Sequence, residues 1–240
     1  MTTRFENRSF EFFEDWASGK VFSDVEFVNC RFRQCHFSSI TFDEIDRLDF
    51  VKLRSRAQRV SFVNSVVEGV TFVGPDIVED STIDGLNVLK HIQTKGTAFK
   101  HVIVKGAIDK LMLTPYIDTF RDHPQLQRAF DEANREHYAI TDWALDISQA
   151  LFKDCDIRNI PSQLIRRDPE TQVVLTREKA MEGRWRELDL SGTYWAGAIK
   201  LFLDDGYQDR LLVAPKGAPN FKRLLDGLNK LRDAGITEPD

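Results

Sequence analysis

The sequence has few cysteines, no long apolar run and no strong excess of charge of either sign. Its 240 residues include three Cys, an odd number that does not build a disulfide framework and indicates a reducing compartment. No window approaches the ~18 apolar residues of a membrane-spanning helix, and residues 1–20 mix acidic side chains into their apolar positions. We therefore expect a cytoplasmic protein with no membrane partner.

The charge balance alone does not identify the class of partner that the protein binds. Lys and Arg total 33 against 38 Asp and Glu, a formal net charge of -5. A nucleic-acid partner is usually met by a strongly basic surface, so this balance does not favour one. Because 42% of the residues are apolar, the chain is expected to bury a substantial core and to be globular.

The common catalytic and cofactor motifs are also missing. The sequence contains no G-x-S-x-G, no phosphate-binding glycine loop and no H-E-x-x-H. It has no C-x-x-C, and no histidine stands at ligand spacing from Cys30, Cys35 or Cys155. We expect no catalytic residue, no cofactor and no metal site, and hence a protein that is not an enzyme.

A five-residue period is the strongest pattern that is present. On an α-helix a residue five positions on lies about 140° further round, and on a straight strand it points to the opposite face. The chain must therefore turn a corner about once per pentad, with the ring and the residue two before it both pointing inward. The rings are Phe22, Phe27, Phe32, Phe37 and Phe42, preceded by the small or aliphatic Val25, Cys30, Cys35 and Ile40. Cys155 stands in a similar inward slot, so all three cysteines are expected in the core.

This pattern resembles the pentapeptide-repeat family, whose members wind a right-handed β-helix of square cross-section with four pentads in each coil. The motif recurs at Val60/Phe62, Ser65/Val67 and Val70/Phe72. After Ile77 the five-residue register of the inward positions shifts, and the original register returns at Ile147. The resemblance implies a mainly β protein, a right-handed quadrilateral β-helix (solenoid). Helical spacing elsewhere in the sequence adds a helical insertion and a helical C-terminal cap.

We expect the chain to have five parts. These are an N-terminal cap at 1–20, a pentapeptide-repeat β-helix at 21–113, a helical insertion at 114–142, a further β-helix coil at 143–162 and an α+β C-terminal cap at 163–240. In the insertion, Asp122 is a candidate N-cap, and four residues follow helical spacing. They are Leu126, Phe130, Ala133 and His137.

The last part is harder to predict. Residues 169–188 indicate a short strand and then a helix, and Leu188–Gly192 looks like one more pentad. Residues 198–213 fit either a hairpin with an Asp-Gly turn or a helix that ends at Gly206. An apolar stripe from Phe221 to Leu231 predicts a helix that ends near Gly235.

Several polar residues invite a functional interpretation. Lysines at 90, 95, 100, 105 and 110 would girdle a four-sided coil and keep its corners soluble. His91 and His101 would lie on opposing walls and share no ligand. Arg54, Arg56 and Arg59 form a short basic cluster that merits mutation.

The first functional hypothesis is a non-enzymatic scaffold for protein–protein interaction. A rigid β-helix would present the insertion and the C-terminal cap to a protein partner, with Arg128, Asp131 and Arg135 as candidate contacts. The family resemblance implies either a bacterial immunity or adaptor role or, as an alternative, a DNA mimic that binds topoisomerase. Mimicry requires a strongly negative face, but residues 20–110 carry 13 Lys and Arg against 12 Asp and Glu. A third hypothesis is an enzyme with its site in residues 163–240.

Overall fold

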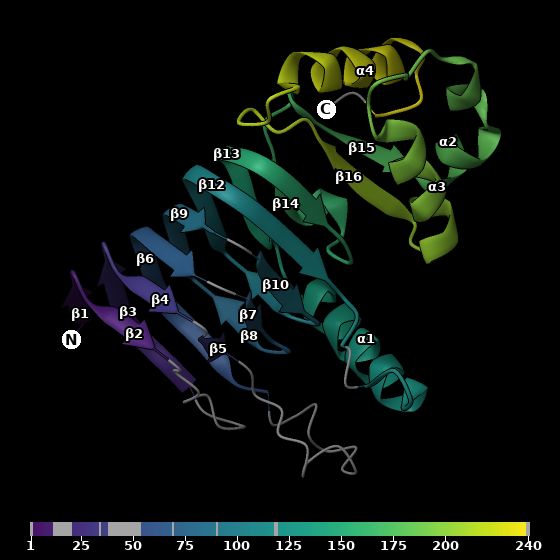
Figure 1. Cartoon of the computed structure of the whole chain (residues 1–240). Coiled ribbons are helices and arrows are strands. Elements are labelled where there is room, and N and C mark those ends of the chain that lie inside the picture. Colours follow the sequence, from purple (N-terminus) through teal and green to yellow (C-terminus); the bar gives the residue numbers. More distant parts are fainter. Residues whose placement is uncertain are drawn as a thin grey trace.

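The computed structural model describes residues 2–11, 21–33, 35–37, 54–68, 70–89, 91–117 and 120–238. The chain is mainly β and is built on a large parallel sheet (Figure 1). The sheet contains β1 (Thr3–Glu6), β2 (Ser9–Glu11), β3 (Val21–Val28), β4 (Arg31–Arg33), β5 (His36–Phe37), β6 (Arg56–Glu68), β7 (Val70–Val73), β8 (Ile77–Glu79), β9 (Thr82–Val88), β10 (His91–Lys95), β11 (Ala98–Lys100), β12 (Val102–Thr114), β13 (Leu145–Ile157) and β14 (Ile165–Arg166). The other elements are the helices α1 (Pro124–Ala139), α2 (Arg177–Glu182), α3 (Trp195–Asp205) and α4 (Phe221–Asp233), the 3-10 turns η4 (Ser162–Leu164) and η5 (Arg184–Glu187), and the antiparallel pair β15 (Gln172–Thr176) and β16 (Asp209–Val213).

A nearly constant length of chain separates β1 from β3, β6 from β9 and β9 from β12, whereas longer segments separate β3 from β6 and β12 from β13. Ser61 of β6 pairs with Thr82 of β9, and Thr82 pairs with Ile103 of β12, a step of 21 residues each time. Figure 1 shows the strands following one another in sequence order from the N-terminal edge to the C-terminal helices. The corresponding position of each repeat therefore lies next to that of the repeats before and after it.

Aromatic rings at the predicted positions stack on rings of the neighbouring strands in the hydrophobic core. Phe27 stacks on Phe5 at 5.4 Å and on Phe62 at 5.1 Å between ring centroids. Ile83 follows Phe62 in register, so the register shift in the sequence leaves the inward column unbroken. Phe42 and the side chains of Phe37, Phe72 and His91 lie outside the described part of the structure.

The inward position of the cysteines is confirmed for two of them. Cys30 and Cys35 are 1% and 0% exposed, and their thiols lie near the carbonyl oxygens of Phe5 and Phe10. Cys155 is half-buried and packs against the same core. Burial and the neighbouring carboxylates raise the pKa of its thiol, so it is not an activated nucleophile.

Residues that tolerate a left-handed backbone mark the bends between strands. One row holds Asn7, Asn29, Asn64, Gly85 and Gly106, which are neighbours in register and all have positive φ. Asparagine and glycine adopt this conformation more easily than other residues. This periodic signal at the bends complements the phenylalanines of the core.

Residues 3–11 belong to the sheet and do not form a separate N-terminal cap. Strand β1 pairs with β3 in parallel, and β2 pairs with β4. Phe5 and Phe10 add one further layer to the aromatic column because they repeat the spacing of Phe27 and Phe32.

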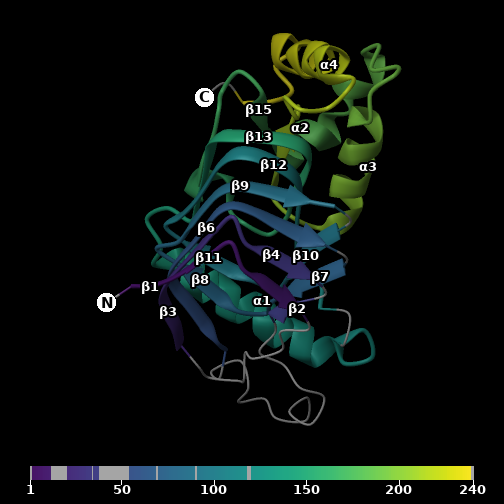
Figure 2. The same cartoon turned by 60° about the vertical axis from the view of Figure 1, so that its left-hand side comes forward.

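The insertion contains α1, which packs on the flank of the sheet away from α4 (Figure 2). Asp122 is not its N-cap: the helix begins at Pro124, whose fixed φ suits a first helical position, and the cap is His123. The buried face consists of Leu126, Phe130, Asn134 and Tyr138, one step beyond the predicted Ala133 and His137.

The C-terminal residues form a second hydrophobic core beyond β13. The helix alternative for residues 198–213 is correct, because α3 ends at Gly206 with φ 81° and buries Trp195, Ile199 and Phe202. Leu188–Gly192 does not extend the sheet: Leu190 packs into the second core instead. The predicted helix near residue 221 is confirmed as α4.

Two backbone contacts and an ion-pair network join this second unit to β13. The amide of Gly217 donates to the carbonyl oxygen of Phe152 at 2.7 Å, and the Gln172 side chain donates to Ile147 at 3.3 Å. In the network, Arg158 and Arg210 both contact Asp156 and Asp205 at 2.7 to 3.6 Å. No helix of the described residues is long and apolar enough to cross a membrane.

Candidate functional site

Arg54 is buried and fixes α1 to the sheet. Its side chain is oriented by four acceptors that come from three different segments. The Nε atom donates to the carbonyl oxygen of Pro75 at 3.0 Å, and Nη2 donates to those of Asp76 and Gly96 at 2.9 Å each. Nη1 donates to Oδ1 of Asn134 on α1 at 2.7 Å. One guanidinium therefore links the insertion to two bends of the sheet.

Arg54 also lies close to an aromatic ring and to the buried carboxylate of Asp76. Its guanidinium carbon lies 5.3 Å from the centroid of the buried Phe130 ring, and the whole residue is 7% exposed. Burial lowers the pKa of Arg54 to about 10, against the opposing effect of the Asp76 carboxylate. Arg56 and Arg59, its neighbours in the predicted cluster, are half-exposed and pair with Glu79 and Asp24. The three arginines of the cluster thus have different roles.

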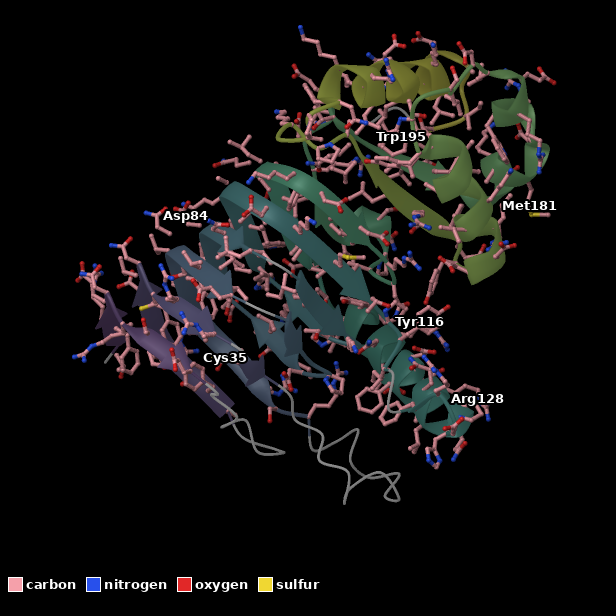
Figure 3. The ribbon with its side chains drawn as sticks, viewed as in Figure 1. Cys35, Asp84, Tyr116, Arg128, Met181 and Trp195 are labelled. Atoms are coloured by element: carbon pink, nitrogen blue, oxygen red, sulfur yellow. The ribbon has the colours of Figure 1, made fainter. Side chains whose placement is uncertain are left out.

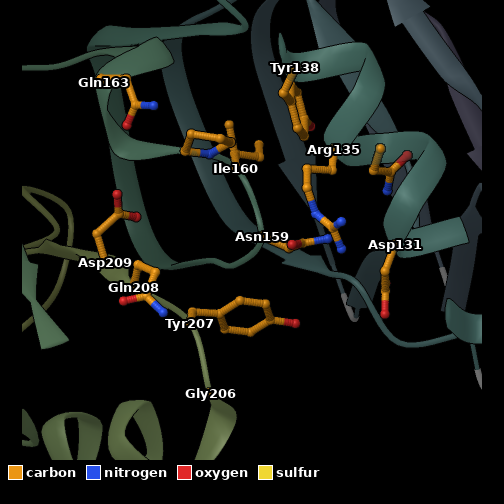
Figure 4. Close-up of a pocket in the computed structure, with 12 residues that line it drawn as sticks. Asp131, Arg135, Tyr138, Asn159, Ile160, Gln163, Gly206, Tyr207, Gln208 and Asp209 are labelled. Atoms are coloured by element: carbon orange, nitrogen blue, oxygen red, sulfur yellow. The ribbon is translucent and has the colours of Figure 1, made fainter.

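A cavity of about 640 Å³ lies between α1, the loop after β13 and the loop before β16. Figure 4 shows Asp131 and Arg135 on the α1 side and Tyr207 pointing toward them from the opposite loop. Most of the residues that line it have polar side chains, although their apolar atoms contribute to its surface as well. They are Asp131, Asn134, Arg135, Tyr138, Asn159, Ile160, Pro161, Gln163, Gly206, Tyr207, Gln208 and Asp209. The cavity thus joins the insertion, the end of the sheet and the C-terminal unit in one concave surface.

Two of the three predicted contact residues line this cavity. Arg135 is exposed, and Asp131 is half-buried and accepts a hydrogen bond from Gln127 at 2.9 Å. Arg128 is exposed on the same helix but does not line the cavity; it projects from the end of α1 that is remote from the sheet (Figure 3). The exposed polar face of α1 therefore continues from the cavity onto open surface.

Burial shifts the pKa values of two ionisable groups in the cavity, Asp131 and Tyr207. Burial raises the pKa of Asp131, with Gln127 and Arg135 acting in the opposite direction. Burial also raises the pKa of Tyr207, so its hydroxyl stays protonated at neutral pH. Asp209 accepts hydrogen bonds from the Ser162 hydroxyl at 2.8 Å and from the Ser162 amide at 3.4 Å. Its carboxylate therefore stabilises the start of η4.

Most cavity residues could not be selected from the sequence. Asn159, Tyr207 and Asp209 stand outside any periodic pattern. Asn159 follows β13, whereas Tyr207 and Asp209 lie about 50 residues later, in the loop before β16 and at its first position. The asparagine at position 159 is itself a sequence signal for a bend, because asparagine often adopts the left-handed conformation, and its φ here is 63°.

The regularly spaced lysines lie on the sheet next to acidic residues of neighbouring strands. Lys100, Lys105 and Lys110 stand beside Glu79, Asp84 and Asp154 on neighbouring strands, so the lysines alternate with acids. Lys90 lies outside the described residues. In the described part of the chain, no three His, Cys, Asp or Glu side chains are arranged to hold a metal ion.

His101 belongs to a second row of left-handed residues at one bend of the sheet. The row contains Asp24, Arg59, Asp80 and His101, all with positive φ, and its charges alternate in sign once His101 is protonated. The two imidazole nitrogens lie 3.0 Å from Asp80 and 2.6 Å from Asp142. Hydrogen bonding to Asp142 and Asp80 raises the pKa of His101 above 6.5.

This raised pKa predicts a pH-dependent stability. Because the folded state favours protonated His101, its contribution is fully present below pH 6.5 and is lost as the pH rises through the folded pKa. We expect His101→Asn, which keeps a side chain that tolerates positive φ, to lower the melting temperature by a few degrees at pH 5.5 and by much less at pH 8.5. Thermal unfolding of both proteins across this range measures the difference.

His137 titrates in both proteins and cancels from the comparison. Burial lowers its pKa, which gives the opposite dependence, and its Nε2 lies 3.1 Å from the Phe99 carbonyl oxygen. An equal deficit of the variant at pH 5.5 and pH 8.5 would show that the imidazolium does not contribute.

Comparison of the chain with family models, with curated proteins and with solved structures finds no match. Function must therefore be argued from the residues themselves.

Proposed function

We propose that the protein is a non-enzymatic binding scaffold that presents α1 and the adjoining cavity to a protein partner. The observation that supports this most is the fixing of α1 by buried Arg54, whose four hydrogen bonds hold the helix to the sheet. A helix held in this way offers Arg128, Asp131 and Arg135 without a large loss of conformational entropy on binding.

We also propose that the parallel sheet is a right-handed quadrilateral β-helix of the pentapeptide-repeat type. The 21-residue step between paired strands supports this, because it is close to the 20 residues of four pentads. The stacking of Phe5, Phe27 and Phe62 supports it too. In such a solenoid each layer contacts only its neighbours, so the scaffold is stiff along its axis.

The charge pattern weighs against a DNA mimic that binds topoisomerase. Acidic residues on the walls are paired with bases of adjacent strands, as in Glu26 with Arg4, Glu68 with Arg31 and Arg33, and Glu79 with Arg56. Mimicry of a phosphate backbone would need acids without this compensation.

An enzymatic site in residues 163–240 remains a hypothesis with less support. Tyr207 and Asp209 are the titratable groups that this segment contributes to the cavity. The bonds of Asp209 to Ser162 and the protonated state of Tyr207 suit binding and local structure better than proton transfer.

A capture experiment tests the scaffold function. Tagged wild-type protein is incubated with extract of its source organism, in parallel with the double variant Arg128→Glu/Arg135→Glu. We expect the wild type to retain a stoichiometric protein partner and the double variant to bind that partner about 10- to 100-fold more weakly, because two contacts become repulsive.

The matched control is Arg184→Glu, the same charge reversal at an exposed position of the C-terminal unit. It should bind the partner as the wild type does. Equal binding by the double variant and the control would contradict a contact through α1.

A further inference from the structure

Among the described residues, β1 is the terminal strand at the N-terminal end of the parallel sheet and pairs only with β3. A strand at the edge of a sheet presents backbone N–H and C=O groups that can pair with another chain. Proteins often block such edges with proline, a bulge or lysine, and the sequence of β1, Thr-Arg-Phe-Glu, contains no proline or lysine.

The opposite end of the sheet is treated differently. Carbonyl oxygens of β13 accept hydrogen bonds from Gly217 and Gln172 of the C-terminal unit. The sheet is thus covered beyond β13 by the second core, whereas the first layer has no comparable cover in the described part of the chain.

The aromatic column also continues to this edge. Phe5 stacks on Phe27 and meets Phe10 edge to face at 5.6 Å. Phe27 is 5% exposed, whereas Phe5 and Phe10 are only half-buried, since they form the outermost described layer. A further layer of rings would bury the remaining apolar surface.

The charges of β1 identify the partner that would supply this layer. Arg4 and Glu6 flank Phe5 on the outer face, contact each other at 3.5 Å and are 52% and 50% exposed; Arg4 also contacts Glu26 of β3 at 2.6 Å. If two copies of β1 pair in antiparallel fashion about Phe5, Arg4 of each copy lies directly opposite Glu6 of the other. Opposite charges that face each other across a strand pair are stabilising, and like charges are destabilising. The strand is therefore complementary to itself in the antiparallel direction.

We propose that the β1 edge binds the β1 edge of a second copy of this chain, forming a symmetric dimer through a continuous sheet. The twofold axis passes beside Phe5 and preserves the inner and outer faces of both sheets. The interface is isologous, so each charge contact occurs twice. It is distant from α1 and does not depend on the proposed partner site.

Complementary charge reversals test the proposal. Arg4→Glu gives an edge with two acids, and Glu6→Arg gives an edge with two bases. By light scattering after size exclusion, and by sedimentation over a concentration series, we expect the wild type to reach twice the 27.7 kDa chain mass. Each variant alone should dissociate at a concentration about tenfold higher or more, and an equimolar mixture of the two should regain the dimer.

Two controls separate this result from misfolding or from the α1 site. Glu6→Arg keeps the pair between Arg4 and Glu26, so its folding is tested independently of Arg4→Glu. Arg135→Glu should dimerise as the wild type does. A wild type that stays monomeric at every concentration, as it would if a segment of its own chain covered the edge, overturns the proposal. A dimer unaffected by both β1 variants, or variants whose mixture does not associate, overturns it as well.

Discussion

Replacement of Arg54 by methionine is expected to lower the free energy of unfolding by about 3–5 kcal/mol. Methionine keeps most of the apolar length of the side chain, so the loss comes from the guanidinium. The carbonyl oxygen of Pro75 and Oδ1 of Asn134 would lose the guanidinium as a donor without gaining access to water. The carbonyl oxygens of Asp76 and Gly96 keep hydrogen bonds from Ala98 and Asn134, but the buried Asp76 carboxylate would lose a nearby positive charge. A buried polar group left without a partner costs about 1–3 kcal/mol, and several at one place exceed the effect of a typical mutation.

Denaturant unfolding measures this loss, and Arg56→Met provides the matched control. Arg56 stands two residues away and pairs with Glu79, but its side chain is 45% exposed. Exposed ion pairs contribute about 0–1 kcal/mol, so the control should stay within about 1 kcal/mol of the wild type. Similar losses for Arg54→Met and Arg56→Met would show that the buried network does not hold α1.

The five-residue period predicts which side chains point into the hydrophobic core that the strands enclose. Phe27 and Phe32 were identified by spacing alone, because every repeat places the same position against the same neighbours. Phe5 and Phe10 have the same five-residue spacing, but they lie outside the repeat that begins at Phe22 in the sequence. Local periodicity is a strong signal when each layer contacts only adjacent layers.

The role of Arg54 could not be predicted in this way. In the sequence it resembles Arg56 and Arg59, and its burial arises from Asn134 and Phe130, which are contributed by α1 about 80 residues later. The cavity has the same origin, since Asn159 and Tyr207 converge only after the insertion and the C-terminal unit have packed on the sheet. A candidate site formed by contacts between distant segments has no periodic signature.

The error at Leu188–Gly192 has a related cause. Five residues with a pentad-like composition cannot specify a strand unless a preceding layer offers them a pairing edge. Here β13 is followed by the short β14, and Leu190 finds a better apolar environment in the second core. The residues of α3 were ambiguous because Asp205–Gly206 suits a hairpin turn as well as a helix end. The helical spacing of Trp195, Ile199 and Phe202 against that core decides between them.

Replacement of Arg210 by methionine is the second change with a large expected effect, a loss of about 3 kcal/mol in the free energy of unfolding. Arg210 lies on β16 with its side chain 9% exposed, and it contacts Asp156 of β13 at 2.8 Å and Asp205 at 3.6 Å. Its removal leaves both carboxylates in a poorly solvated place with Arg158 as their remaining charged neighbour. Breaking a buried ion pair is costly because the uncompensated charge stays behind.

Because this network joins β13 to the second core, its loss should affect cooperativity as well as stability. We expect the C-terminal unit of Arg210→Met to unfold at a lower denaturant concentration than the sheet. With Trp16 and Trp143 replaced by Phe in every protein compared, the fluorescence of Trp185 and Trp195 should then change before the β-sheet circular dichroism signal. Lys179→Met is the control within the same unit, since the pair of Lys179 with Glu182 is exposed and contributes about 0.2–0.5 kcal/mol. If Arg210→Met and Lys179→Met show the same midpoint and the same single transition, the network between β13 and β16 does not couple the two cores. The attachment of the C-terminal unit would then come from the packing of Val174, Leu211 and Val213 against the core of the sheet, and from hydrogen bonds such as those of Gly217 and Gln172 to β13.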